Sequence, residues 1–549
     1  MKKWLSGLLA LALVLSLASM GLAKGLSDDP AAPLGKYAEP VVVKMCLGTN
    51  MAMVFPEGDS YENNVWTRSL LEDLNIQVEY AWTAVAGDKY DTKLNLAIAT
   101  NDLPDIFATS NYTQFNQMVK GGLIQDLGAV YDQYVSDQVR GYMSQDGGKS
   151  MGWGNIGGVQ YGLPKDGVDL QSPYFVYIRD DFAQEMGLTE APATMDQVVE
   201  LAKAYAAKAE GNFAFALGSG IYTDGFANIA GLCNAYGAYP EAWLEDENGK
   251  LVYGTIQPEM KDALAVYADL YKNGYIDPAF ASYDGNKIAE QMTSGKVGVI
   301  IGRSWVLGWP LEAMYETDGV TWSVYPLVKF ESNPNEIKLQ TSDVKAAMDV
   351  VRAGYEHPEA LLKIINYEAM KVNDPELAEP DKFHSDENYG YHMMAPIYPI
   401  KSDTLINLNT SVHVTQAIDN NDEAYLITPH DKKQYPNVKA YFDTQKAGGE
   451  QQIAYINGYK SWYGEGSIFG ILNQYYYGDK LLTSKLTGIE TPEMSRSKAN
   501  LDMFVKQALA EFITGVRPID QFDAFVDEWR AMGGSIIEDE LNEWYQSTK

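Results

Sequence analysis

The chain has 549 residues, 46% of them hydrophobic and 12% aromatic, and its formal net charge is −32. A chain of this length buries more than one hydrophobic core, which predicts two or more lobes. The negative charge argues against nucleic acid and anionic membrane surfaces as partners. Tyrosine and tryptophan exceed what a core needs, which indicates a recognition surface, because each combines an apolar face with a polar group.

Residues 1–23 have the pattern of a secretory signal peptide. Two lysines precede an apolar run over residues 4–17, and small residues suit cleavage after Ala23. The end of this segment resembles the start of a bacterial lipoprotein box, but Met20 stands where a cysteine would carry the lipid. We therefore expect an exported protein, at the cell surface or extracellular, without a lipid anchor.

The two cysteines, Cys46 and Cys233, are too few for a disulfide framework. Export permits one disulfide, whereas a buried free thiol suits the strand pattern around Cys46, and the pairing stays open. The five histidines have no metal-ligand spacing. We therefore expect no metal and no cofactor.

The chain after the signal peptide begins with a polar segment, residues 24–39, which predicts a flexible leader. Strand and helix patterns then alternate. Strands are expected at residues 41–47, 76–82 and 105–108, and helices at residues 64–74 and 89–100. This alternation predicts an α/β fold with a parallel, doubly wound sheet.

A helix, a glycine stop and a short strand follow one another within residues 286–305. The apolar run at residues 297–301 is typical of a strand covered on both faces. Trp305 comes just after this strand, and ligands of open α/β sheets bind beyond the carboxyl ends of the strands. Trp305 is therefore a candidate ligand-binding residue, and a core position near a hinge is the alternative.

Several motifs along the chain resemble those of one protein family. They are residues 93–106 (KLNLAIATNDLPDI), 122–127 (GLIQDL), 161–164 (YGLP), 174–182 (YFVYIRDDF), 271–278 (YKNGYIDP), 513–515 (ITG), 527–529 (DEW) and 542–545 (NEWY). Together they are similar to the family 1 extracellular solute-binding proteins, the receptors of bacterial ABC importers for carbohydrates. The resemblance extends over nearly the whole mature chain.

The resemblance implies two α/β lobes joined by a multi-strand hinge, with a ligand cleft between them. Lobe one would comprise residues 40–163 plus 326–405, and lobe two residues 164–325 plus 406–549. It also implies a substrate-binding protein and not an enzyme, which captures a carbohydrate and delivers it to ABC transporter permease subunits. We expect a monomer. An exported carbohydrate-active enzyme, or a glycan-binding surface protein without a transport role, is the alternative.

The resemblance also singles out individual residues. Trp305, in the second lobe, falls where maltose-binding relatives have a stacking tryptophan. Asn111 and Tyr112 follow a strand at the position of the family's polar sugar contacts, and Asn111 is otherwise a helix cap. Asn50 follows the first strand in the same way. Trp153 is an aromatic residue between glycines that looks exposed.

Further candidates lie in the second lobe. Tyr174 belongs to the motif at the lobe crossing, and Tyr222 and Asp224 correspond to a cleft-facing loop, with a surface turn as the alternative. Trp462 and Tyr463 precede two nearby glycines and look like an exposed platform. Aromatic rings stack on the C–H faces of sugars, and amides and carboxylates bind their hydroxyl groups.

The charge balance favours a neutral oligosaccharide over a uronate. Arg179 and Arg303 are the cations near the expected cleft, and no basic cluster accompanies them. A strongly negative protein without such a cluster repels anionic ligands.

Overall fold

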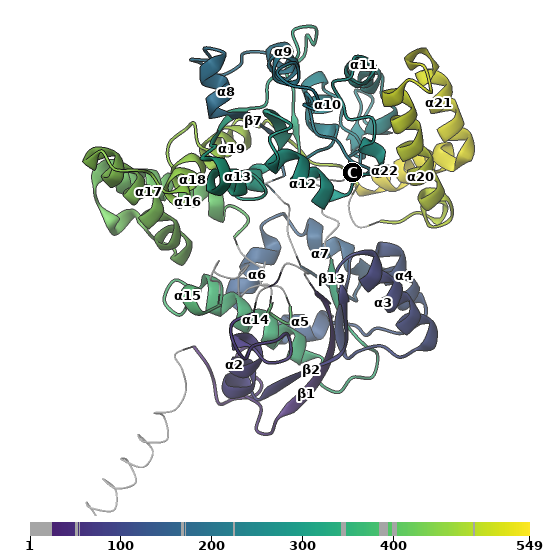
Figure 1. Cartoon of the computed structure of the whole chain (residues 1–549). Helices are drawn as coiled ribbons and strands as arrows, with labels where there is room; N and C mark the ends of the chain where they lie inside the picture. Colours follow the sequence, from purple (N-terminus) through teal and green to yellow (C-terminus); the bar gives the residue numbers. More distant parts are fainter. Residues whose placement is uncertain are drawn as a thin grey trace, which may run out of the picture. The chain divides into compact units, whose positions relative to one another are not determined.

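A computed structural model describes residues 25–49, 53, 55–165, 170, 172–222, 226–341, 347–383, 394–397, 403–486 and 489–549. The chain forms two compact units (Figure 1), unit 1 from residues 1–167 and 345–403, and unit 2 from residues 168–344 and 404–549. Each unit is assembled from two separate stretches of sequence, so the chain passes from one unit to the other three times.

The second of these crossings follows residue 344 and not residue 326, where the sequence pattern placed it. β11 (Trp322–Pro326) pairs with a strand of unit 2, and Leu327 and Phe330 after it are buried in the core of that unit. Burial of these apolar side chains keeps the chain in unit 2 beyond residue 326, the boundary that the family resemblance implies.

Unit 1 contains a five-stranded sheet in the order β2-β1-β3-β13-β6. Its strands are β1 (Val41–Thr49), β2 (Ile76–Val85), β3 (Ile106–Thr109), β6 (Leu163–Pro164) and β13 (Met348–Val351). β1 pairs in parallel with β2 and β3, as the alternating pattern predicts. β13 comes from the second stretch of the unit and pairs antiparallel with β3 and β6, so the sheet is mixed.

The helices of unit 1 complete its core. They are α2 (Val65–Leu74), α3 (Asp88–Thr100), α4 (Tyr112–Lys120), α5 (Gly128–Tyr134), α6 (Asp137–Ser144), α7 (Lys149–Trp153), α14 (Glu359–Asn373) and α15 (Pro380–Phe383), with a small hairpin of β4 (Asn155–Ile156) and β5 (Val159–Gln160). α2 and α3 are the two helices that the sequence predicts. α14 is buried on nearly all sides, which is typical of a central core helix.

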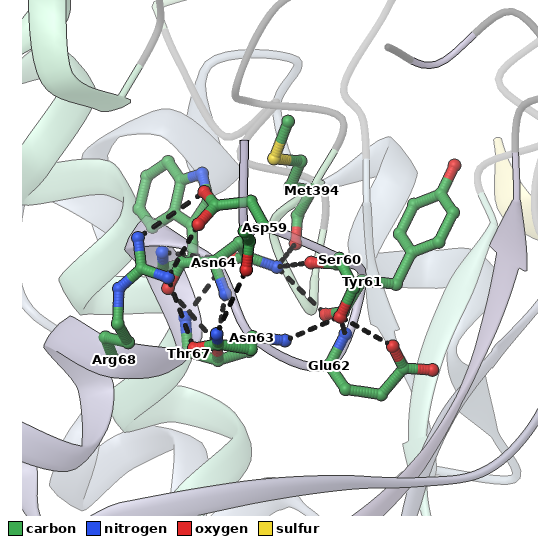
Figure 2. Close-up of polar contacts among 11 residues, drawn as sticks. Asp59, Ser60, Tyr61, Glu62, Asn63, Asn64, Thr67, Arg68 and Met394 are labelled. Atoms are coloured by element: carbon green, nitrogen blue, oxygen red, sulfur yellow. Dashed lines mark hydrogen bonds and ion pairs between the residues drawn. The ribbon is translucent and has the colours of Figure 1, made fainter. Parts of the chain in front are cut away.

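The start of α2 is fixed by the side chain of Asn64. Its oxygen accepts hydrogen bonds from the backbone N–H groups of Trp66 and Thr67, and the Thr67 hydroxyl group accepts one from the Asn64 N–H. The Asn64 amide also donates to the carbonyl oxygens of Ser60 and Tyr61 at 3.1 and 2.9 Å (Figure 2). One buried side chain therefore holds both the helix start and the loop before it.

The described part of the expected flexible leader, residues 25–39, packs against α14 instead. The buried Lys363 side chain donates to the carbonyl oxygens of Ala32 and Gly35 at 2.9 and 2.7 Å, and Tyr37 joins the core of unit 1. Burial lowers the pKa of Lys363 to about 8. The polar composition of the segment does not indicate this, because backbone carbonyl groups and a few apolar side chains, Leu26, Leu34 and Tyr37, anchor it.

Unit 2 contains a three-stranded sheet in the order β10-β7-β11, formed by β7 (Phe175–Arg179), β10 (Val299–Gly302) and β11. β10 is buried along its whole length, which confirms the predicted covered strand. β10 and β11 both pair antiparallel with β7, so the prediction of a parallel sheet is wrong for this unit. A two-stranded hairpin, β8 (Trp243–Glu245) with β9 (Leu251–Tyr253), and the pair β12 (Leu339–Gln340) with β14 (Leu481–Leu482) accompany it.

The described part of unit 2 is largely helical. Its helices are α8 (Asp180–Glu185), α9 (Met195–Ala206), α10 (Ala230–Tyr236), α11 (Glu259–Lys272), α12 (Gly285–Thr293), α13 (Glu312–Asp318), α16 (Ile406–Asn420), α17 (Pro429–Ala447), α18 (Ile453–Trp462), α19 (Ile468–Tyr477), α20 (Pro492–Thr514), α21 (Phe522–Trp529) and α22 (Ser535–Thr548). Within the described ranges, no helix combines the length and the hydropathy needed to cross a bilayer.

Both cysteines are free and buried, Cys46 in unit 1 and Cys233 in unit 2. This answers the question of pairing that the sequence leaves open. Burial raises the pKa of the Cys46 thiol to about 12, so the group stays protonated and unreactive near neutral pH.

Candidate ligand-binding site

Two exposed tryptophans lie directly after β10. The strand ends at Gly302, and Arg303 precedes the short 3-10 helix η3 (Ser304–Leu307), which carries Trp305. Trp305 and Trp309 are 42% and 41% exposed, and their ring centroids lie 6.1 Å apart. Such exposure is unusual, because tryptophan has a large apolar surface that is mostly buried in folded proteins.

The buried ring of Phe226 contacts both indoles. Its centroid lies 5.6 Å from that of Trp305 and 5.3 Å from that of Trp309, both in edge-to-face geometry. We call these three side chains the aromatic platform. A ring that is anchored on one side and open on the other offers a flat apolar surface, which suits the C–H face of a sugar.

Polar side chains lie close to the platform in the sequence: Asn228 follows Phe226, and Arg303 precedes Trp305. The Asn228 amide donates to the Tyr174 hydroxyl group at 2.8 Å, and the Arg303 guanidinium carbon lies 5.8 Å from the centroid of the Tyr174 ring. The Tyr177 hydroxyl group donates to the Arg303 carbonyl oxygen at 2.8 Å. Arg303 thus links Tyr174, which is buried, to the neighbourhood of the exposed Trp305, and both residues are predicted from the sequence.

Three other predicted site residues are buried in the cores of their own units. Trp462 stacks on Phe469 with centroids 4.3 Å apart, and Trp153 meets Tyr112 edge to face at 5.1 Å. The expectation that these two tryptophans are exposed is therefore wrong, because each has an aromatic neighbour that covers it. Tyr222 is also buried, and desolvation raises its pKa well above the ordinary value.

Asn111 and Tyr112 lie where β3 gives way to α4. Asn111 is exposed and caps α4, since its side-chain oxygen accepts hydrogen bonds from the backbone N–H groups of Thr113 and Gln114. This is the capping alternative that the sequence allowed, and the nitrogen of the amide is not part of the cap. Tyr112 is half-buried between Phe115 and the neighbouring Trp153.

Tyr463 is half-buried, and its hydroxyl group donates to Asp419 at 2.6 Å. This hydrogen bond, together with burial, raises the pKa of Tyr463 to about 12. Asn50 and Asp224, the two remaining predicted residues, lie outside the described residues. As ligand contacts, all ten residues stay predictions.

A cavity of about 250 Å³ lies in unit 1 at the carboxyl ends of β1, β2 and β3. Its lining includes Leu47, Gly48, Tyr90, Ser110, Lys165 and Asp349. Lys165 faces the buried Asp349 at 3.8 Å, so the cavity holds a partly enclosed ion pair. Sequence reasoning missed these residues, although the rule that ligands bind at strand ends points to the same edge.

A family comparison decides which kind of protein carries these features. Residues 56–356, more than half of the chain, match the model of the bacterial extracellular solute-binding proteins. The chain belongs to this family. Its members are substrate-binding proteins and not enzymes, which removes the alternative of a carbohydrate-active enzyme.

A curated lipoprotein and several solved solute-binding proteins resemble this chain along most of its length. Lipoprotein LipO of Bacillus subtilis (strain 168) is 24% identical over 491 residues, which cover 86% of this chain and 87% of LipO. The substrate-binding protein FusA of S. pneumoniae, solved with kestose, matches with a TM-score of 0.63 at 13% identity, covering 93% of this chain and 100% of FusA. A solute-binding protein of Bifidobacterium longum infantis gives 0.60 at 14%, covering 93% and 99%. These structures share the two-lobed fold.

Unit 2 of this solute-binding protein has a second cavity, of about 640 Å³, between α9, α11 and residues 330–335. Carboxylates dominate its lining, with Asp196, Glu200, Glu259, Asp262 and Asp269. Lys203 pairs with Glu200 at 3.1 Å, and none of the predicted site residues contributes. The carboxylates do not converge, since no group of three or more His, Cys, Asp and Glu in the described chain is placed to hold a metal.

Proposed function

We propose that this solute-binding protein is the receptor of an ABC importer and captures a neutral oligosaccharide in a cleft between its lobes. The aromatic platform carries the proposal. Trp305 and Trp309 stand open beside each other at a strand end and are backed by the buried Phe226. A pair of open aromatic faces suits the apolar C–H faces of sugar rings.

The similar structures support a carbohydrate as the ligand class. FusA was solved with kestose, the Bifidobacterium protein is described as binding human milk oligosaccharides (HMO), and NgtS of Streptococcus pneumoniae is described as an N-glycan transport protein. Each is at most 14% identical to this chain, so they support the ligand class and not an individual sugar.

The charges favour a neutral sugar. Arg179 is held by Asp181 at 2.6 Å and by the Tyr205 hydroxyl group at 3.0 Å, so its charge is already neutralised. Arg303 is then the single arginine beside the platform, in a chain of net charge −32. One cation in a strongly negative field gives little attraction for a polyanion.

The test is a glycan array followed by calorimetry on the wild-type protein. We expect binding of one or more neutral oligosaccharides with little dependence on salt, because no ion pair forms with the ligand. Polyuronates should bind at least about tenfold more weakly. Tight, salt-sensitive binding of a polyuronate together with no binding of neutral glycans would contradict the proposed ligand class.

Export and partners complete the proposal. The family is extracellular, and residues 1–23 have the pattern of a cleaved signal peptide. We infer a monomer on the outer side of the membrane that hands its sugar to permease subunits. Co-purification with the permeases in the presence of the bound sugar, and not in its absence, is the expected result.

A further inference from the structure

Arg303 differs from every other arginine of the chain in its partners. The other seven each pair with a carboxylate within 4 Å: Arg68 with Asp59, Arg140 with Asp132, Arg179 with Asp181, Arg352 with Asp105, Arg496 with Glu493, Arg517 with Glu511 and Arg530 with Glu538. No carboxylate of the described chain pairs with Arg303. The protein has 74 acidic and 42 basic residues, so an arginine that forms no ion pair within the described chain is unusual.

The position of Arg303 makes the missing partner costly. Its Nε atom is buried and has no hydrogen-bond acceptor within the described residues. A buried donor without an acceptor destabilises the folded protein, and the penalty is larger for a charged group. The guanidinium carbon lies 5.8 Å from the centroid of the Tyr174 ring, which offers an aromatic face to the charge.

The backbone at Arg303 is held by a side chain from the neighbouring strand β7. The Tyr177 hydroxyl group fixes the Arg303 carbonyl oxygen, and Tyr174 is itself held by Asn228. Two residues further along the chain, Trp305 presents its open face. Arg303 is therefore a charged residue with a donor, Nε, that has no acceptor among the described residues, and it lies two residues from an open aromatic ring. This arrangement suits a residue that binds an acceptor of the ligand.

We propose that Arg303 determines ligand specificity by donating from its guanidinium group to neighbouring oxygen atoms of the sugar on the aromatic platform. This inference rests on the proposed function. The planar guanidinium carries five donors in a fixed fork, which matches two adjacent hydroxyl oxygens of one ring. A lysine ammonium is a flexible point charge and does not reproduce that fork.

The test uses the full-length mature protein and the neutral oligosaccharide that binds wild type most tightly on the array. Calorimetry is run on Arg303→Met, Arg303→Lys and the control Arg496→Met, which removes an exposed arginine from α20. We expect a loss of affinity of at least about tenfold for Arg303→Met, about fivefold or more for Arg303→Lys, and none for the control. Thermal melts without sugar should show no loss of stability for Arg303→Met, since the Nε atom has no acceptor among the described residues.

A set of monodeoxy analogues of the sugar identifies the hydroxyl groups that Arg303 binds. Removing such a group should weaken wild type but leave Arg303→Met unchanged, a coupling that a purely structural arginine does not produce. Unchanged affinity of Arg303→Met overturns the inference. So does a large loss of apo stability with normal affinity in the folded fraction. Wild type that binds no glycan overturns the proposed function and this inference with it, whereas normal wild-type binding with an inert Arg303 overturns the inference alone.

Discussion

Trp305 and Trp153 show how neighbours decide the role of one residue type. Trp153 packs among the apolar side chains of unit 1 and contacts Tyr112, so its ring is buried in the core. Trp305 shares Phe226 with Trp309 and keeps an open surface. In the sequence, Trp153 lies between glycines and Trp305 follows a strand. The sequence does not reveal that Trp153 contacts Tyr112 or that Trp305 contacts Phe226, because these partners lie far away along the chain. For this reason the open tryptophan and the covered one look alike before the fold is known.

Replacement of Trp305 by alanine should impair binding but not folding. A stacked aromatic face contributes about 1–3 kcal/mol, so the dissociation constant should rise roughly ten- to a hundredfold. Trp153→Ala is the matched control and should lower the free energy of unfolding by about 3–5 kcal/mol, because it leaves a cavity in a core. Ligand titration beside denaturant melts of both apo variants separates the two effects. A large loss of apo stability in Trp305→Ala, with normal affinity in the folded fraction, would falsify the stacking role.

Helix starts and strands follow from local signals, and here the sequence is a good guide. Asn64 predicts the start of α2 because its side chain satisfies free N–H groups of the first turn, a contact within three residues. The strand after residue 296 is recognisable from its unbroken apolar run. The leader is the opposite case. Its anchor, Lys363, lies more than three hundred residues away, and lysine is ordinarily a surface residue.

Asn64→Ala should destabilise unit 1 by about 2 kcal/mol, since it removes a helix cap and frees buried carbonyl groups of the preceding loop. Asn63→Ala, at the exposed neighbouring position, should change stability by less than about 0.5 kcal/mol. Urea melts monitored by circular dichroism measure the difference. Equal stability of the two variants would mean that the network in Figure 2 does not hold the helix start.

Lys363 should make the anchoring of the leader depend on pH. Its pKa is about 8 in the folded protein and about 10.4 in an unfolded chain. Between these values the unfolded chain binds more protons, so the free energy of unfolding rises with pH. The stability advantage of wild type over Lys363→Met should therefore grow from about pH 8 to about pH 10. The exposed Lys250→Met serves as control, and an advantage that stays constant with pH contradicts the expectation.

At the scale of the whole molecule, each unit has its own hydrophobic core and is joined to the other by three crossings of the chain. Chain connections between two units with their own cores suit a hinge motion, the mechanism by which binding proteins close around a ligand. The family resemblance led to this organisation from the sequence. The place of the second crossing required knowledge of where Leu327 and Phe330 are buried.

We expect small-angle scattering to give a smaller radius of gyration when the identified oligosaccharide is saturating than in its absence. The lobes close only if the ligand binds both of them better together than apart. Trp305→Ala at the same sugar concentration should remain close to the ligand-free profile. A wild-type profile that does not change at saturation argues against a closing receptor.

The place of β13 in the first sheet has a consequence for biogenesis. β13 lies between β3 and β6, yet its residues, Met348–Val351, follow the whole first stretch of unit 2 in the chain. During synthesis or passage across a membrane from the N-terminus, β3 and β6 emerge long before the strand that joins them. Until then both present unpaired backbone edges, which are sites of aggregation. A nascent chain arrested before residue 348 should therefore depend on a chaperone that shields those edges, and the released full-length chain should not.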